Sequence, residues 1–133
     1  MSLSKWISVL HAVITGSIFL PWSNNMEFGY GNMVVGVNLQ FGYVRPAAWV
    51  MITFCFLYYF VDFLLKKIAP SIIEKIRNYF VWALFFIAGF ESFSIVFLSA
   101  PGMYVPQIGL TVAFFSSILI VILYNIKTYK KSV

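Results

Sequence analysis

The chain has 133 residues, of which 62% are hydrophobic and only 10% are charged, and its formal net charge is +5. This composition leaves little for a water-soluble fold, and four long apolar stretches leave no room for a separate soluble catalytic or sensor domain. The positive residues flank these stretches, so we expect no nucleic-acid partner.

Each apolar stretch is long enough to cross a bilayer, because a hydrocarbon core about 30 Å thick needs about 20 helical residues. The stretches cover about residues 5–21, 46–65, 79–98 and 106–126. We therefore expect one integral membrane domain over residues 1–133, with an all-α transmembrane fold built as a four-helix bundle. The first stretch resembles a signal peptide, but no small-x-small cleavage pattern follows, so we expect a retained helix. Pro21 and Trp22 end it at the outer interface, where an indole ring sits well.

The basic residues predict the orientation. Two loops, over residues 22–45 and 99–106, carry Arg45 as their lone basic residue, and we place both loops outside. Under the positive-inside rule both termini are then cytoplasmic. We expect a multi-pass protein of a bacterial inner or plasma membrane, surrounded by lipid. The basic residues expected inside are Lys5, Lys66, Lys67, Lys75, Arg77, Lys127, Lys130 and Lys131.

The first outer loop alternates apolar and polar residues from Met33 to Tyr43, which is the period of a half-buried strand. Gly31–Asn32 suits a two-residue turn, because glycine takes positive φ freely. We predict a short extracytoplasmic β-hairpin over about residues 26–43. Its register sets Tyr30 opposite Met33, Phe28 opposite Val35 and Met26 opposite Val37, which makes one apolar contact face.

The segment between the second and third stretches carries charge. Asp62 and Lys66 lie one helical turn apart, and we interpret them as an ion pair at the inner interface. Beyond Pro70, apolar residues recur at helical spacing over residues 72–80. We expect an amphipathic segment that lies on the inner interface and runs directly into the third stretch.

Glu91 is the strongest candidate for an intramembrane polar site, because it lies about 20 Å from the inner surface at 1.5 Å per residue. A carboxylate at that depth is usually buried against protein or water. It shares a helical stripe with Leu84 and Ala88, whereas Phe86 and Phe90 belong to a bulkier stripe suited to lipid. Glu91 either locks helix packing or forms a proton, cation or substrate site. Hydroxyls at similar depth complete a predicted polar layer: Thr15, Thr53, Ser94, Ser116 and Ser117.

His11 is the one histidine of the chain, so we interpret it as a polar contact between helices and not as a metal or haem ligand. Cys55 is the one cysteine and is most simply a packing residue. No nucleophile–base pair, phosphate-binding loop or metal cluster is found, so we predict no enzyme, no metal and no cofactor. Gly29–Tyr30–Gly31 matches only the end of a potassium-channel filter, and the strand register explains these glycines better.

Four spans with an outer sheet between the first two resemble the general plan of claudin-like tetraspan proteins. The paired cysteines and the Trp–Cys–Cys signature of that loop are absent, so the resemblance is one of architecture and implies no family.

Two functions from different classes follow as hypotheses. The first is a small non-enzymatic tetraspan protein, an accessory, assembly or scaffolding subunit that forms homo-oligomers or binds other membrane proteins. The alternative is a small oligomeric transporter or channel with Glu91 in its pathway. A quinone- or lipid-binding role is a third option, which only the abundant aromatic residues favour.

Overall fold

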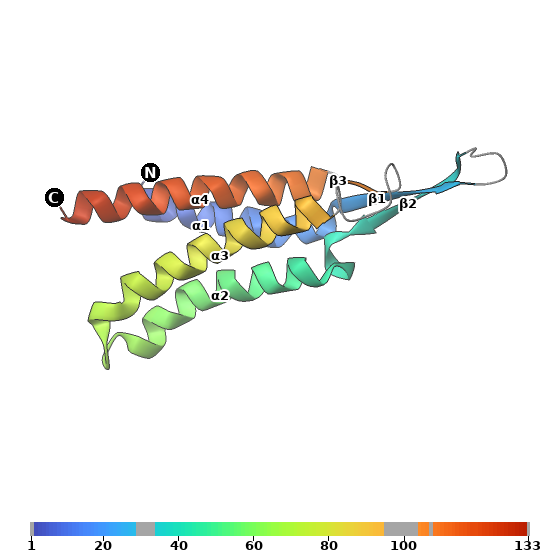
Figure 1. Ribbon diagram of the computed structural model, residues 1–133. Helices are drawn as coiled ribbons and strands as arrows, with labels where there is room; N and C mark the ends of the chain where they lie inside the picture. The colour runs from blue at the N-terminus through green and yellow to red at the C-terminus, as the bar shows by residue number, and fades with distance from the viewer. Residues whose placement is uncertain (1, 29–33, 95–103, 107, 133) are drawn as a thin grey trace.

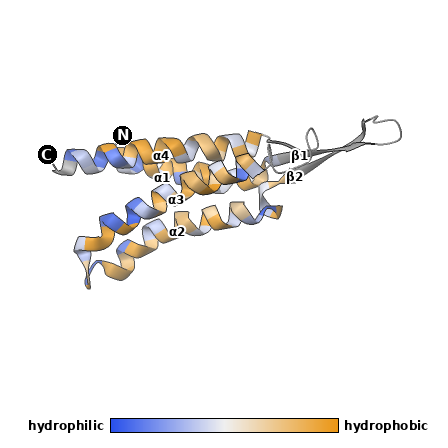
Figure 2. Ribbon diagram, in the orientation of Figure 1, coloured by the Kyte–Doolittle hydropathy of each residue, from blue (hydrophilic) through white to orange (hydrophobic). Residues whose placement is uncertain are grey.

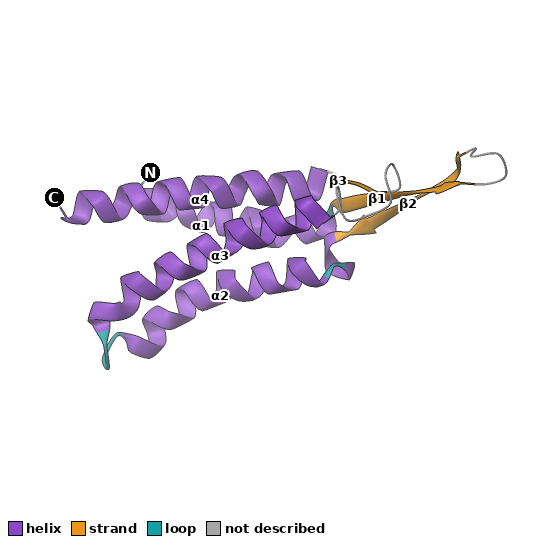
Figure 3. Cartoon of the chain, in the orientation of Figure 1, coloured by secondary structure: helices purple, strands orange, loops and turns teal. Residues whose placement is uncertain are grey.

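The computed structural model describes residues 2–28, 34–94, 104–106 and 108–132. Four α-helices and three strands follow one another, with short 3-10 segments (η) between some of them (Figures 1 and 3). In chain order the elements are α1 (Leu3–Gly16), η1 (Ser17–Phe19), β1 (Pro21–Phe28), β2 (Val34–Phe41), η3 (Gly42–Val44), α2 (Pro46–Leu65), η4 (Pro70–Ile72), α3 (Ile73–Phe93), β3 (Tyr104–Pro106) and α4 (Ile108–Ser132).

The helices form a bundle that is closed on three sides. α2 packs against α3, α3 against α4, and α4 against α1, whereas α1 and α2 meet at few positions. Both chain termini and the connection between α2 and α3 lie at one end of the bundle, and the sheet projects from the other (Figure 1). The α2–α3 pair diverges from the α1–α4 pair toward the end that carries the termini.

The helix boundaries follow from local chemistry. The Ser2 hydroxyl accepts the Lys5 amide N–H at 3.3 Å and caps α1. Pro46 occupies the first turn of α2, where its missing N–H leaves no bond unmade, and α2 covers residues 46–65 as expected. α3 begins at Ile73, so the amphipathic segment does run directly into the third helix.

The first helix is shorter than expected. α1 ends at Gly16 and continues only as the 3-10 turn η1, and Pro21 already belongs to β1. Leu20 has extended backbone angles, because the ring of the following proline disfavours the helical conformation. The fourth helix is longer than expected and runs to Ser132.

By length and composition, two helices are apolar enough to cross a membrane, namely α2 and the Ile108–Lys130 part of α4. α1 with η1 forms a shorter apolar helix, Leu3–Phe19. The first turns of α3 carry Glu74, Lys75 and Arg77, which lower its hydropathy. The four-span topology and its orientation therefore remain predictions.

The three strands form one antiparallel sheet in the order β2-β1-β3. Met26 pairs with Val37, which is the expected register, but Phe28 pairs with Val34 and not with Val35 because a bulge interrupts the pairing after Glu27. Tyr30, Met33 and the expected turn lie outside the described residues, so a closed hairpin remains a prediction.

The third strand was not expected from the sequence. Residues 104–106 pair with β1, with Ser23 opposite Pro106 and Asn25 opposite Tyr104. We expected a loop over residues 99–106, with the fourth helix beginning near Pro106, whereas Pro106 ends β3. β1 is therefore the central strand, and the sheet ties the start of α4 to the end of α1.

Trp22 anchors the sheet to the bundle. It is fully buried, and its indole N–H donates to the Ser17 carbonyl oxygen at 2.9 Å. A Cβ added at either Gly42 or Gly109 would lie 2.6 Å from a Trp22 ring atom. The sequence places Trp22 at the outer end of the first helix but does not predict its burial, which is possible because these glycines let the backbones of η3 and α4 approach the ring.

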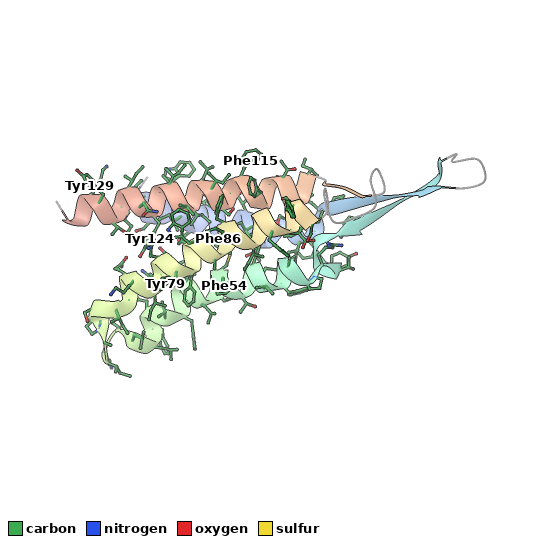
Figure 4. All side chains as sticks on the ribbon, in the orientation of Figure 1. Phe54, Tyr79, Phe86, Phe115, Tyr124 and Tyr129 are labelled. Carbon is green, nitrogen blue, oxygen red and sulfur yellow. The ribbon has the colours of Figure 1, made fainter. Side chains whose placement is uncertain are left out.

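The outer faces of the helices are apolar. Figure 2 shows apolar residues along the helices, with hydrophilic residues gathered at the start of α3 and toward the end of α4. Phe86 and Phe90 are 63% and 66% exposed, while Leu84 and Ala88 of the same helix are buried. The two predicted stripes of α3 are confirmed for these residues. Phe115 of α4 likewise projects away from the bundle (Figure 4).

Candidate functional site

Glu91 meets a cation at the end of the bundle that carries the sheet. The Arg45 Nε–H donates to Glu91 Oε1 at 2.7 Å, and Arg45 Nη2 contacts the same oxygen. The side chains of Glu91 and Arg45 are 10% and 23% exposed. An ion pair that is largely removed from water gains strength from its charge-assisted hydrogen bonds, and each partner compensates the other's desolvation.

The chain topology brings this pair together. Arg45 directly precedes Pro46 at the start of α2, and Glu91 lies within the last turn of α3. Because α2 and α3 are antiparallel and packed together, the start of one lies beside the end of the other. Glu91 and Arg45 each stand out in the sequence, but their pairing was not predicted. Their opposite charges, and the outer position expected for both, were the signal that could have indicated it.

Three hydroxyls of the predicted polar layer bond within their own helices. The hydroxyls of Thr15, Thr53 and Ser117 donate to the carbonyl oxygens of His11, Trp49 and Phe114. These acceptors lie three or four residues earlier in the same helix, which is the common local bond of such side chains. Ser116 is buried on α4, and Ser94 caps α3, where its backbone N–H donates to the Glu91 carbonyl.

His11 belongs to a polar cluster nearer the end that carries the termini. Its Nδ1 lies 2.9 Å from the Tyr59 hydroxyl, which in turn donates to Ser8 Oγ at 2.9 Å. The Tyr59 oxygen therefore accepts from His11 Nδ1–H, which leaves Nε2 as the unprotonated ring nitrogen. His11 is buried, and Nε2 has no hydrogen-bond partner among the described residues. His11 is thus the predicted contact between α1 and α2.

A tyrosine-rich group extends this cluster to α3 and α4. The Tyr124 hydroxyl lies 2.6 Å from Glu74 Oε2 and 2.7 Å from the Glu74 carbonyl oxygen (Figure 4 labels Tyr124). Arg77 donates to the Tyr58 carbonyl oxygen at 2.9 Å, and its guanidinium lies 4.5 Å from the centre of the Tyr58 ring. The Tyr58 and His11 rings are 4.8 Å apart. All four helices therefore contribute to this inner cluster, which the sequence analysis missed.

The expected ion pair between Asp62 and Lys66 is not formed within the part of the chain that the structure describes. The two residues are joined through the backbone, where the Lys66 N–H donates to the Asp62 carbonyl at 3.0 Å. Asp62 is half-buried and Lys66 is exposed at the end of α2. Lysine at the end of a helix is instead free to extend toward solvent.

No group of three metal-ligating side chains occurs among the described residues. No protein-family model matches the sequence, and no curated protein matches it either. The chemistry of the site therefore rests on its own geometry, which is an ion pair at one end of the bundle and a tyrosine–histidine cluster toward the other.

Proposed function

We propose that this chain is an integral membrane protein of four crossing helices that serves as a non-enzymatic accessory, assembly or scaffolding subunit. The apolar outer faces of all four helices support a lipid environment, because soluble monomers rarely expose such extensive apolar surface. Phe63 on α2 and Phe19 near the end of α1 are 79% and 70% exposed, which is expensive in water and favourable in hydrocarbon.

The charge distribution supports cytoplasmic termini. Lys66 and Lys67 directly follow α2, and Lys75 and Arg77 lie in the first turns of α3, at the end of the bundle that also carries both termini. At the opposite end, Arg45 is compensated by Glu91. The uncompensated positive charge of the described helices is therefore concentrated at one end, as the positive-inside rule requires of cytoplasmic flanks.

The observation that carries the structural role is the Arg45–Glu91 pair. A carboxylate that serves a transport pathway has to be reached by its substrate, whereas Glu91 is buried and its Oε1 is held by two guanidinium nitrogens. The pair joins the start of α2 to the end of α3, at the end of the bundle from which the sheet projects. This arrangement supports a role in holding the outer end of the bundle in one geometry, from which the sheet is presented.

The assembly role predicts a partner. Protein extracted in mild detergent is expected to run as an oligomer or with another membrane protein, and crosslinking in native membranes should capture the same species. A photocrosslinker at Phe56, on the exposed face of α2, is matched by one at Phe115 on α4. Strictly monomeric protein without any crosslinked partner from either position contradicts the proposal.

The alternative is an oligomeric transporter or channel, which one observation favours: Glu91 is a buried carboxylate among predicted membrane helices. Proteoliposome flux compared between the wild type and Glu91→Gln separates the two functions. Flux that is present in the wild type and lost in Glu91→Gln favours transport. Flux at background level in both the wild type and Glu91→Gln contradicts the transport function.

The topology is tested independently of the assembly role. Tags at both chain ends are expected to be reachable from the cytoplasmic side only, and the protein should stay in membranes after alkaline carbonate extraction. Tags on opposite sides contradict the four-span topology. Release without detergent contradicts the membrane location.

A further inference from the structure

The open side of the bundle contains a groove between α1 and α2. The hollow between the two helices has a volume of about 270 Å³. Ser8 also lines a hollow at the start of α1, and Phe56 and Tyr59 also line one on the face of α2. The residues that line the hollow between the helices are Ser8, His11, Ala12, Thr15, Cys55, Phe56 and Tyr59.

The charged residue of this groove lies at the start of α1. Lys5 and Ser4 line the hollow there, and Ser8 and Tyr59 follow. At 1.5 Å per residue, Lys5 lies about 4.5 Å from Ser8 along the helix axis, and Ser8 lies about 6 Å from Ala12. Ala12, Cys55 and Phe56 line the deeper part together with His11 and Thr15; His11 Nδ1 and the Thr15 hydroxyl bond within the protein. A cation, then hydroxyls, then a mostly apolar wall match the order of a glycerophospholipid: phosphate, ester carbonyls, acyl chain.

The hydrogen bonds of the groove leave a donor for such a ligand. His11 Nδ1–H donates to the Tyr59 oxygen, and the Tyr59 O–H donates to Ser8 Oγ. Ser8 therefore accepts from Tyr59, and its own hydroxyl hydrogen has no acceptor among the described residues. Ser8 is exposed at the groove, where an ester carbonyl, which only accepts hydrogen bonds, would pair with it.

We propose that this groove binds one anionic phospholipid of the inner leaflet. Its phosphate lies at Lys5 and Ser4, an ester carbonyl accepts from Ser8, and an acyl chain lies along Ala12, Cys55 and Phe56. The charge complementarity between Lys5 and the phosphate selects an anionic headgroup, since a basic residue at the membrane surface attracts anionic lipid. This inference rests on the proposed membrane location.

Native mass spectrometry of the full chain in detergent tests the site, with phosphatidylglycerol and phosphatidylcholine as probes. We expect phosphatidylglycerol to bind more tightly, and Lys5→Ala to weaken it about fivefold, as the loss of one basic contact implies. Ala12→Phe fills the groove and should remove the bound lipid. The matched controls are Lys75→Ala, a cation on α3, and Val13→Phe, which adds the same ring to an exposed position of α1 outside the groove. Neither should change lipid binding.

Three outcomes overturn the inference: equal binding of the two lipids, no effect of Lys5→Ala, or conversion of a dimer to a monomer by Ala12→Phe without loss of lipid. The last assigns the groove to a second copy of the chain. Should Ala12→Phe fail to fold by circular dichroism, Lys5→Ala still decides, because Lys5 is exposed. Alkaline carbonate extraction distinguishes a failure of the proposed function from a failure of this inference. Release from membranes defeats the proposed function, whereas retention without lipid selectivity defeats this inference alone.

Discussion

The two ends of the helical bundle handle charge differently. At the end that carries the sheet, Arg45 and Glu91 form one direct pair, and both side chains are largely buried. Toward the end that carries the termini, Arg77 and Glu74 are 3.9 Å apart, and Glu74 is 38% exposed. The Tyr124 hydroxyl and the Tyr58 carbonyl oxygen supply the shorter contacts there.

The difference follows from access to water. A buried charge has to be paired directly, because its desolvation is uncompensated otherwise. Glu74 is more exposed and keeps part of its hydration, while the buried Arg77 guanidinium contacts the carbonyl oxygen and the ring of Tyr58, so several weaker contacts suffice there. The outer pair is therefore expected to be sensitive to any single change, whereas the inner cluster should tolerate the loss of one contact.

Breaking the outer pair is expected to have the largest effect. Arg45→Ala leaves the Glu91 carboxylate buried without this guanidinium and should lower the free energy of unfolding by about 3 kcal/mol. Thermal unfolding in detergent measures it. The double variant Arg45→Met with Glu91→Leu removes both charges and should recover most of the loss. A double variant as unstable as Arg45→Ala would mean that charge pairing is not what Arg45 contributes.

The packing around Trp22 gives the next largest effect, again at the outer end. Gly42→Ala puts a Cβ 2.6 Å from the Ile18 Cα and the Trp22 ring, and should cost about 1–3 kcal/mol of stability. Gly89→Ala is the matched control, because its added Cβ would meet Phe114 at an ordinary 3.6 Å. Equal melting temperatures for the two variants would contradict the close packing of Trp22.

The inner cluster should respond more weakly. Tyr124→Phe removes the hydroxyl that contacts Glu74 and should destabilise the protein by about 1 kcal/mol, the typical net value of one hydrogen bond. Tyr58→Phe keeps the ring that stacks on Arg77 and should change stability less. A loss as large as that of Arg45→Ala would show that the two ends do not differ in the way described.

The smallest effect is expected at Thr53, a member of the predicted hydroxyl layer. Its hydroxyl bonds within α2 and is exposed, so Thr53→Val should change stability by less than about 0.5 kcal/mol. It should also leave the effect of Glu91→Gln unchanged in a double-mutant cycle. Energetic coupling between Thr53 and Glu91 would support the predicted polar layer around Glu91.

Much of the fold could be predicted because membrane-length apolar runs and helical stripes are local signals. α2 and the stripes of α3 follow from residue spacing alone. β3 could not be predicted, since three residues pair with a strand some 80 positions earlier and carry no alternation of their own. The burial of Trp22 could not be predicted either, because it depends on glycines in two distant elements.

The candidate site divides in the same way. The sequence by itself determined that Glu91 faces the bundle interior and that His11 makes a polar contact, because each is a costly polar group on a helix whose other face is apolar. Only the tertiary structure decided which residues bond to Glu91 and His11. Arg45, Tyr59 and the tyrosine cluster come from other helices, and pairing across 46 or 48 positions depends on how antiparallel helices are set side by side. Periodicity along one helix carries no information about that setting.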